Sequence, residues 1–281
     1  MSQRQACGLM RISRNGYRYR SQRNDEALRK AIKEKAGDRP RYGYRRIAVL
    51  LRREGWRDNR KRIYRIYREL GLQVRKRKRK RTARARKRPL VIPEGANMRW
   101  SMDFMSDQLA DRRRIRTLNI VDDFTRECLH IEVDTSIPAS RVVQVLEWLE
   151  ALRGLPVQIV MDNGTEFTSL EMDKWFYDHE GTDACFIDPG KPNQNAYIES
   201  FNEKFRDECL NQYWFGSVEE AQMIAEDWRI DYNTFRPHSS LGDMTPEEYA
   251  ETQSCLRSAS PPSGMPVFQR NMLTNSAVGL T

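Results

Sequence analysis

Val157-Gln-Ile-Val-Met-Asp-Asn-Gly-Thr-Glu-Phe167 joins an apolar run to an acidic turn. The run at 157–161 is short and mostly apolar, which predicts a buried strand bounded by a turn. Asp162 follows it directly, at the kind of strand end where α/β folds place functional groups. Asn163-Gly164 then favours a sharp change of chain direction. The stretch predicts an α/β domain that presents an acidic side chain at an edge of its sheet.

Strand-like and helix-like segments surround this stretch on both sides. Further strands are predicted at 100–106, 116–121, 128–133 and 184–187, and helices at 140–152, 195–210 and 217–233, with one more helix after Thr168-Ser169. Strands that first form a meander and then alternate with helices predict a mixed sheet flanked by helices. Asp122 and Asp123 open the hairpin turn between two of these strands. We interpret them as turn residues, with a supporting role beside a site as the alternative.

Two other acidic residues lie in comparable surroundings. Asp103 lies in the strand-like Trp100-Ser-Met-Asp-Phe-Met105, and Glu199 in the helical start Asn195-Ala-Tyr-Ile-Glu-Ser-Phe-Asn202. Each of them alone would pass for an ordinary turn or surface residue. If the fold brings Asp103, Asp162 and Glu199 together, they form an oxygen-ligand cage for Mg²⁺, the ion used to break and remake phosphodiester bonds. We therefore treat all three as candidate catalytic and metal-binding residues.

The helix that carries Glu199 offers a second function. Positions 199, 202, 203 and 206 share one face of it, so Glu199, Asn202, Glu203 and Arg206 would be presented together. Arg206 is predicted to hold a DNA phosphate beside the metal-binding carboxylates.

Charge is divided unequally along the 281 residues. The net charge is +10, yet residues 1–99 hold 34 lysines and arginines against 8 acidic residues, a net of +26. Residues 100–281 hold 15 against 31, a net of −16. A strongly basic half predicts a module that grips nucleic acid. The alternative is a basic half that only aids solubility, which self-repulsion disfavours.

Three short helices are predicted in the basic half, after an irregular segment at 1–20. The last two, joined by a turn with Gly55, match a helix-turn-helix. The second of that pair carries five basic residues, which suit a DNA groove and its phosphates: Arg60, Lys61, Arg62, Arg65 and Arg68. Generic three-helix packing with surface arginines is the alternative.

A basic run follows these helices. Eleven of the fourteen residues at 75–88 are Lys or Arg, too polar to bury a core. We expect this run, including Arg75, Lys76, Arg77 and Lys78, to contact the DNA backbone and to add affinity without sequence choice. A solvated tether is the alternative. The predicted domains are thus a helical DNA-binding domain at 1–74, a basic linker at 75–94, a catalytic core at 95–250 and a poorly ordered tail at 251–281.

The remaining composition excludes several classes of protein. The five cysteines are scattered, which is typical of reduced thiols in a cytosolic protein. No apolar run approaches the length of a membrane span, and no N-terminal signal pattern is present. The three histidines are too dispersed for a zinc site.

Several long motifs, in order over roughly residues 40–250, resemble those of the DDE transposases of bacterial insertion sequences, the type made from the second reading frame. They include Ile120-Val-Asp-Asp-Phe-Thr-Arg126, Asp162-Asn-Gly-Thr-Glu-Phe167, Pro189-Gly-Lys-Pro-Asn-Gln-Asn-Ala196, Ile198-Glu-Ser-Phe-Asn202 and Tyr232-Asn-Thr-Phe-Arg-Pro-His-Ser-Ser-Leu-Gly242. The catalytic cores of this family are similar to those of retroviral integrases.

The resemblance implies a ribonuclease H-like core in which Asp103, Asp162 and Glu199 bind two Mg²⁺ ions, with Mn²⁺ as a substitute. It places Arg206 where the family has a basic residue that contacts DNA. One departure is visible, since 36 residues separate Asp162 from Glu199, one more than is usual in the family. Glu203 is a weaker candidate for the third carboxylate.

The implied activity is metal-dependent strand cleavage at the ends of an insertion sequence, followed by transfer of the 3′-OH to a target. Implied partners are DNA, further copies of the chain and a first-reading-frame protein, in the cytoplasm of a bacterium and on its nucleoid. Two alternatives stay open, a DNA-binding regulator with an inactive core and a structure-selective nuclease.

Overall fold

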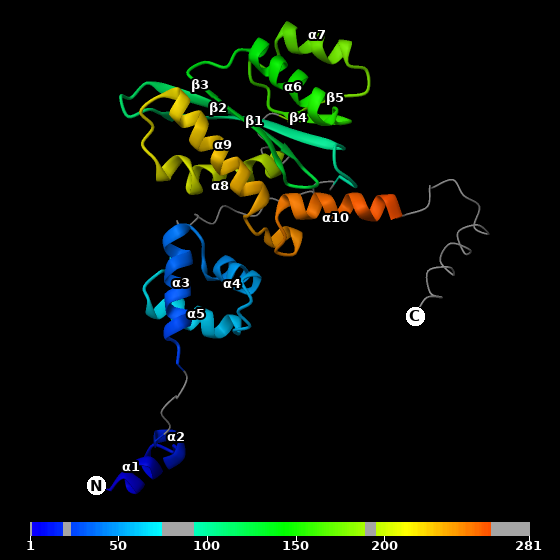
Figure 1. Cartoon of the computed structure of the whole chain (residues 1–281). Coiled ribbons are helices and arrows are strands. Elements are labelled where there is room, and N and C mark those ends of the chain that lie inside the picture. The colour runs from blue at the N-terminus through cyan, green and yellow to red at the C-terminus, as the bar shows by residue number, and fades with distance from the viewer. Residues whose placement is uncertain (1, 19–23, 75–92, 189–194, 260–281) are drawn as a thin grey trace, which may run out of the picture. The chain divides into compact units, whose positions relative to one another are not determined.

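The computed structural model describes residues 2–18, 24–74, 93–188 and 195–259 (Figure 1). The chain divides into two compact units, residues 1–78 and 79–281. The predicted contacts of Arg75, Lys76, Arg77 and Lys78 lie outside the described residues. Within those residues, no helix combines the length and apolar character needed to cross a membrane.

The first segment of the basic unit is helical, and the prediction that it is irregular was wrong. Helices α1 (Gln3–Leu9) and α2 (Arg14–Arg18) form there. The Ser2 side chain accepts a hydrogen bond from the Gln5 backbone, and the Gln5 side chain accepts one from the Ser2 backbone. This reciprocal capping box satisfies amide groups that the first turn of a helix otherwise leaves unpaired.

The next three helices, α3 (Glu26–Asp38), α4 (Tyr44–Arg53) and α5 (Arg60–Glu69), lie where the sequence predicts them. They share one apolar core, in which Ile32, Leu51 and Ile66 are fully buried. Asn59 caps α5 by accepting a hydrogen bond from the Lys61 amide at 2.9 Å. Gly71 follows the helix with a positive φ of 68°, a conformation that glycine adopts without strain.

A five-stranded mixed sheet organises the second unit, as predicted. Its strands are β1 (Arg99–Gln108), β2 (Arg114–Asp122), β3 (Cys128–Asp134), β4 (Gln158–Met161) and β5 (Asp183–Phe186). Their spatial order is β3-β2-β1-β4-β5. The first three strands form an antiparallel meander, whereas β4 pairs with both β1 and β5 in parallel. Strand β1 therefore lies at the centre of the sheet.

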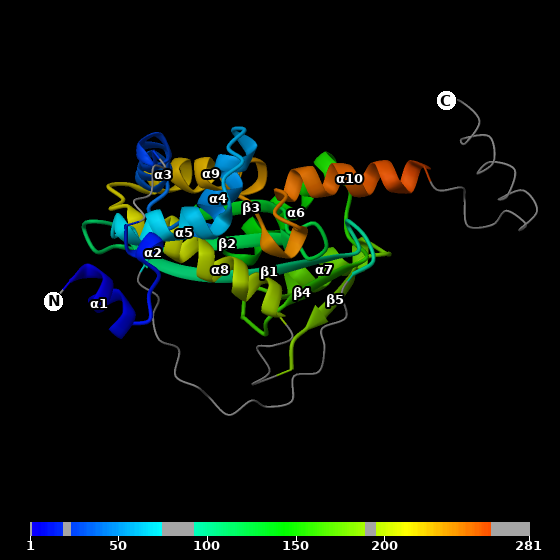
Figure 2. The ribbon, with the colours of Figure 1, turned by 90° about the horizontal axis from the view of Figure 1, so that it is seen from below.

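Helices cover both faces of this sheet (Figures 1 and 2). Helices α6 (Ala139–Arg153) and α7 (Leu170–Asp178) enclose one apolar layer with Trp100 and Met102 of β1. Helices α8 (Ala196–Glu208) and α9 (Val218–Thr234) enclose the other layer, which includes Met105. Since side chains of a strand alternate between its faces, Asp103 points toward the α8 side.

Two short 3₁₀ helices, η2 (Leu210–Gln212) and η3 (Ser239–Leu241), precede and follow α9. Helix α10 (Pro246–Ala259) comes next. It passes through residue 250, so the expected poorly ordered tail does not begin there. The part of that tail at 260–281 lies outside the described residues.

Candidate active site

Asp103 lies in the middle of β1, opposite Asn119 of β2. Its carboxylate has two fixed hydrogen-bond donors. The Phe104 backbone amide donates to Oδ1 at 2.8 Å, and Nδ2 of Asn202 donates to Oδ2 at 2.7 Å. The half-buried carboxylate is thus held from the strand on one side and from α8 on the other.

Asp162 reaches the same end of the sheet through the neighbouring strand. The parallel register pairs Ser101 with Val160, so Asp103 and Asp162 each lie two residues beyond a paired position. Oδ1 of Asp162 accepts a hydrogen bond from the Gly164 amide at 2.9 Å. A Cβ at Gly164 would lie 3.0 Å from this Oδ1. A larger residue at 164 would therefore require the Asp162 carboxylate to shift by a few tenths of an ångström.

Helix α8 runs along β1 and carries Glu199 between two anchoring points. Before it, Nδ2 of Asn195 donates to the Met102 carbonyl at 3.3 Å, and one turn after it Asn202 donates to Asp103. Glu199 itself is exposed to solvent. The strand β1 thus sets where this part of the helix lies.

The three carboxylates share one electrostatic environment. Burial, followed by the negative charges of Asp162 and Glu199, raises the pKa of Asp103 to about 6. Among the described residues, no three His, Cys, Asp or Glu side chains are close enough to form a ready-made metal cage. Accumulated negative charge on oxygen donors nevertheless suits a divalent cation such as Mg²⁺, which would relieve the repulsion that raises this pKa.

The turn after Asp162 is fastened to the sheet by residues whose role the sequence did not reveal. Glu166 forms an ion pair with Arg116 of β2, and the Arg116 guanidinium lies 4.3 Å from the centre of the Phe104 ring. Phe104 in turn stacks on Phe167 with 4.9 Å between ring centres. The motif that begins at Asp162 is therefore packed directly against the residue that follows Asp103.

Asp122 and Asp123 are fully buried and shape the β2–β3 turn. Oδ1 of Asp122 accepts hydrogen bonds from the Phe124 and Thr125 amides, at 2.8 and 3.0 Å. Asp123 accepts from the Ser101 hydroxyl at 2.8 Å and pairs with Arg99 at 2.6 Å. These contacts fit the interpretation as turn residues and also tie the turn to the start of β1.

The side chains that were predicted to share one face of α8 differ in their exposure to solvent. Asn202 is buried and Glu203 is exposed. Nη2 of Arg206 donates to the Ser106 carbonyl at 2.9 Å, and its Nη1 lies 3.8 Å from an Asp107 oxygen. Its side chain is still 42% exposed. Arg206 thus anchors α8 to β1 and keeps solvent access at the same end of the sheet as the carboxylates.

The basic residues of α5 fall into two groups. Arg62 pairs with Asp25 and Asp58 at 2.5 and 2.7 Å, and Arg65 pairs with Asp25 at 2.7 Å. These ion pairs lower the pKa of Asp25 and join α5 to the start of α3. The charges of Arg62 and Arg65 are thus already balanced within the domain.

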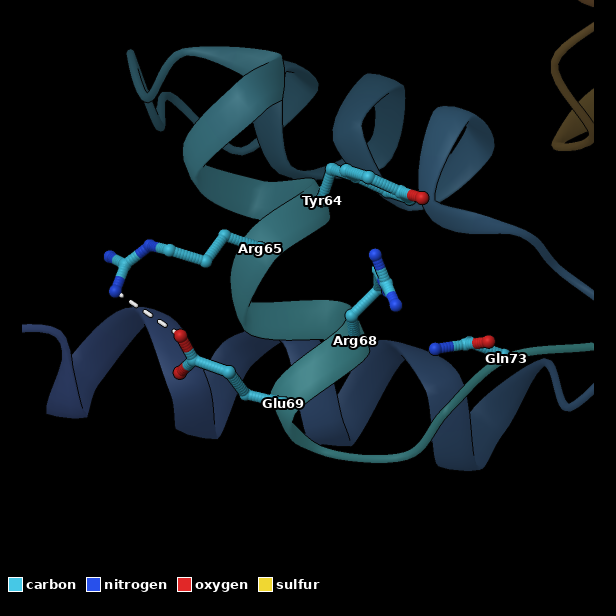
Figure 3. A pocket seen from close by; sticks show the side chains of 5 residues that line it. All are labelled: Tyr64, Arg65, Arg68, Glu69 and Gln73. Carbon is cyan, nitrogen blue, oxygen red and sulfur yellow. Dashed lines mark hydrogen bonds and ion pairs between the residues drawn. The ribbon is translucent and has the colours of Figure 1, made fainter.

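Arg68 belongs to a different surface of α5. Its guanidinium lies 5.8 Å from the centre of the exposed Tyr64 ring. Figure 3 shows an open hollow that both side chains line together with Gln73, Arg65 and Glu69, and in which Arg65 reaches toward Glu69. Arg60 and Lys61, in the first turn of α5, are exposed as well.

Family models match nearly the whole described chain. An HTH-like domain matches residues 22–81, and Integrase core domain models match residues 93–192 and 180–246. The first match covers α3 to α5, and the other two together contain Asp103, Asp162 and Glu199.

Curated relatives agree with these matches. The chain is 44% identical to an uncharacterised 31.7 kDa protein of insertion element IS407 from Burkholderia multivorans, over 89% of this chain and 91% of the relative. It is 44% identical to a 39.2 kDa protein of IS476 from Xanthomonas euvesicatoria, over 89% and 72%. It is also 29% identical to the transposase InsD of IS2 from Escherichia coli, over 78% and 76%.

A solved structure shares the fold. A chain of the simian T-cell lymphotropic virus intasome, solved in complex with PP2A regulatory subunit B56 gamma, aligns with a TM-score of 0.52 at 14% identity, over 84% of this chain and 76% of that one. The predicted ribonuclease H-like fold is thereby confirmed. With its helix-turn-helix-like domain and integrase core, this chain belongs to the insertion-element transposases, a family of polynucleotidyl transferases.

Proposed function

We propose that the chain is a Mg²⁺-dependent DDE transposase that cleaves DNA strands at the ends of its insertion sequence and transfers the resulting 3′-OH to a target. Asp103, Asp162 and Glu199 hold the metal ions. The observation that carries this proposal is geometric: Asp103 and Asp162 each lie two residues beyond a paired position on the neighbouring parallel strands β1 and β4, and Glu199 lies on the helix that Asn202 ties to Asp103. Glu203 is not needed in this assignment.

Two bound Mg²⁺ ions, or Mn²⁺ in their place, would supply an activated water or 3′-OH and stabilise the departing oxygen. The protein's own contribution is positioning. Asp103 is held by Phe104 and Asn202, Asp162 by the Gly164 amide, and Glu199 by the anchored helix α8. Arg206 binds a DNA phosphate beside them, because its exposed guanidinium retains donors beyond the one used on Ser106.

The helical domain binds the element ends. Of the predicted contacts on α5, Arg60, Lys61 and Arg68 face solvent, and we assign them to the DNA backbone or groove. Arg65 contributes chiefly through its ion pairs. Arg75, Lys76, Arg77 and Lys78 add phosphate contacts that carry no sequence information.

Replacement of Asp162 with Asn tests the metal assignment. The change keeps the size of the side chain and its acceptor for the Gly164 amide, but removes the charge. We expect strand cleavage to fall by at least about a thousandfold while binding to element-end DNA stays within about twofold. Cleavage is measured on labelled DNA taken from the flanks of the gene, and binding by fluorescence anisotropy. Wild-type cleavage by the variant would refute the assignment.

The same labelled DNA separates the two alternatives. A structure-selective nuclease cuts DNA without joining its 3′-OH to a second molecule, whereas a regulator with an inactive core binds without cutting. We expect joined products whose yield depends on Mg²⁺ or Mn²⁺. We also expect the active form to be an oligomer that bridges two ends, with or without a first-reading-frame protein, acting on the nucleoid in the bacterial cytoplasm.

A further inference from the structure

Asn202 and Asn119 form a chain of amides that ends on Asp103. Nδ2 of Asn119 donates to Oδ1 of Asn202 at 2.7 Å, and Nδ2 of Asn202 donates to Oδ2 of Asp103 at 2.7 Å. Both asparagines are buried, Asn119 completely and Asn202 with 9% of its surface exposed. Three separate elements, β2, α8 and β1, are joined by these two bonds.

The direction of this chain is set by chemistry. An ionised carboxylate only accepts hydrogen bonds, so Asn202 must turn its NH₂ group toward Asp103. Its carbonyl oxygen then faces Asn119, which must in turn present its own NH₂ group. Asn119 therefore fixes the orientation of the Asn202 amide, because its own hydrogen bond goes to Asn202 and not to the Asp103 carboxylate opposite it.

Asn119 also has a buried polar atom that lowers the stability of the protein, and the packing of β2 does not require it. Its Oδ1 is buried and has no hydrogen-bond partner among the described residues. A buried polar atom without a partner is destabilising, and an apolar side chain at this position of β2 would avoid it. Retention of an amide here is understandable if its NH₂ group is needed to orient Asn202.

We propose that Asn119 and Asn202 are positioning residues that hold the Asp103 carboxylate, and through α8 also Glu199, in the arrangement that binds the metal ions. This inference rests on the proposed function. Asn202 lies one turn after Glu199, so the bond to Asp103 fixes the distance between that turn of α8 and β1. Groups that orient metal ligands in this way commonly change metal affinity tenfold to a hundredfold when they are replaced.

The experiment measures Mn²⁺ affinity by isothermal titration of the DNA-free full chain. Asn202→Leu and Asn119→Leu keep the approximate side-chain shape but remove the amide. We expect Asn202→Leu to weaken Mn²⁺ binding by about tenfold to a hundredfold and Asn119→Leu by a smaller factor. Since the proposed action of Asn119 runs through Asn202, the double variant should bind like Asn202→Leu alone, whereas independent effects, including a direct effect of Asn119 on the Asp103 side chain opposite it, would add.

A matched control comes from the other end of the same helical layer. Asn233 of α9 also ties a helix to a strand, since its side chain accepts from the Cys128 amide at 2.9 Å and donates to the Cys128 carbonyl at 2.8 Å. Asn233→Leu removes a comparable bridge that does not contact Asp103. It should leave Mn²⁺ affinity unchanged. Thermal unfolding in EDTA measures how much each variant lowers the stability of the metal-free protein.

The outcomes separate this inference from the proposed function. If the wild type fails to bind Mn²⁺, or if Asp162→Asn binds it equally well, the metal site is wrong and the inference is overturned with it. If Asp162→Asn loses binding but Asn202→Leu retains wild-type affinity, or if the two asparagine effects add, only the inference is overturned. Should Asn202→Leu fail to fold, unchanged affinity in Asn119→Leu overturns the inference by itself.

Discussion

Asp103 is held at a position that is unfavourable for its own charge. In the metal-free protein its pKa is raised to about 6, first by burial and then by Asp162 and Glu199, whereas an unfolded chain has the ordinary value near 3.8. A carboxyl with a raised folded pKa makes the protein lose stability as the pH rises from about 4 to about 6, and the loss is complete above that range. The metal-free site therefore lowers the stability of the folded protein at neutral pH, and a bound metal ion would reverse this effect.

Replacement of Asp103 with Asn should stabilise the metal-free protein at pH 7. Because the charge is removed but the new NH₂ group faces that of Asn202, we expect the free energy of unfolding in EDTA to rise by about 1 kcal/mol, a figure reduced for the lost hydrogen bond and for partial exposure of the group. At pH 4, where the folded wild type already carries the proton, the two proteins should differ little. Urea unfolding followed by tryptophan fluorescence measures both values, and a variant that is less stable at pH 7 would contradict the expectation.

At the scale of single residues, the sequence identified the acidic side chains but not what holds them. Strand ends and helix faces pointed to Asp103, Asp162 and Glu199, and their role as ligands stays a prediction. The bond from Asn202 to Asp103 could not be predicted, because the two residues lie 99 positions apart along the chain and meet only where α8 packs on β1. The pairing of Glu166 with Arg116 has the same long-range origin.

Helix α5 shows how one element combines a structural face with a binding face. Arg62 and Arg68 lie on the same helix, yet Arg62 joins it to Asp25 and Asp58 while Arg68 lies beside the exposed Tyr64. A sequence pattern counts both simply as basic. Only the positions of the acidic residues in three dimensions decide which charges remain available for DNA.

These two arginines should therefore respond differently to replacement. Arg68→Ala should leave the melting temperature of the helical unit unchanged, weaken DNA binding for all sequences and reduce the log–log salt slope by about 1. Arg62→Ala should lower the melting temperature, since Asp25 and Asp58 each lose a partner. Circular dichroism measures the melting temperature, and binding titrations over a range of salt concentrations measure the DNA affinity and the salt slope. Equal behaviour of the two variants would argue against this division of roles.

Elements with a strong apolar pattern were predicted well, and the two short N-terminal helices were not. Apolar periodicity located α3 to α9 and all five strands to within a few residues. The helices α1 and α2 were missed because they are short and bury little, although Ser2 and Gln5 carry the capping-box signal. Helix α10 extends beyond the expected core end because its acidic first turn, with Glu247 and Glu248, favours a helix that the Ser- and Pro-rich composition further along obscured.

Across the whole catalytic unit, a buried ion pair joins the layer around α8 to the chain that follows α9. Arg236 binds Glu208 through two hydrogen bonds of 2.7 and 2.8 Å, and only 1% of the Arg236 side chain is exposed. Its guanidinium also lies 5.4 Å from the centre of the Tyr232 ring. Arg236-Pro-His-Ser-Ser-Leu241 thus has the structural role that a turn after a helix suggests.

Removal of Arg236 should lower the stability of the protein, because the largely buried Glu208 carboxylate loses two hydrogen bonds and the positive charge beside it. We expect Arg236→Leu to lower the free energy of unfolding by roughly 3 kcal/mol or more, and the additional change Glu208→Leu to recover part of that loss. Denaturant titration of the single and double variants measures both. A double variant that is less stable than the single one would show that the Glu208 carboxylate has other favourable partners.

The order of the elements along the chain has a consequence during protein synthesis. The helical unit is complete early in the chain, and so is the β1–β3 meander, but β4 and α8 leave the ribosome much later. Nascent chains therefore acquire their DNA-binding helices before all three carboxylates exist. Under the proposed function, a product of premature termination before α8 would bind element ends without cutting them, and it would compete with the full-length protein for these ends.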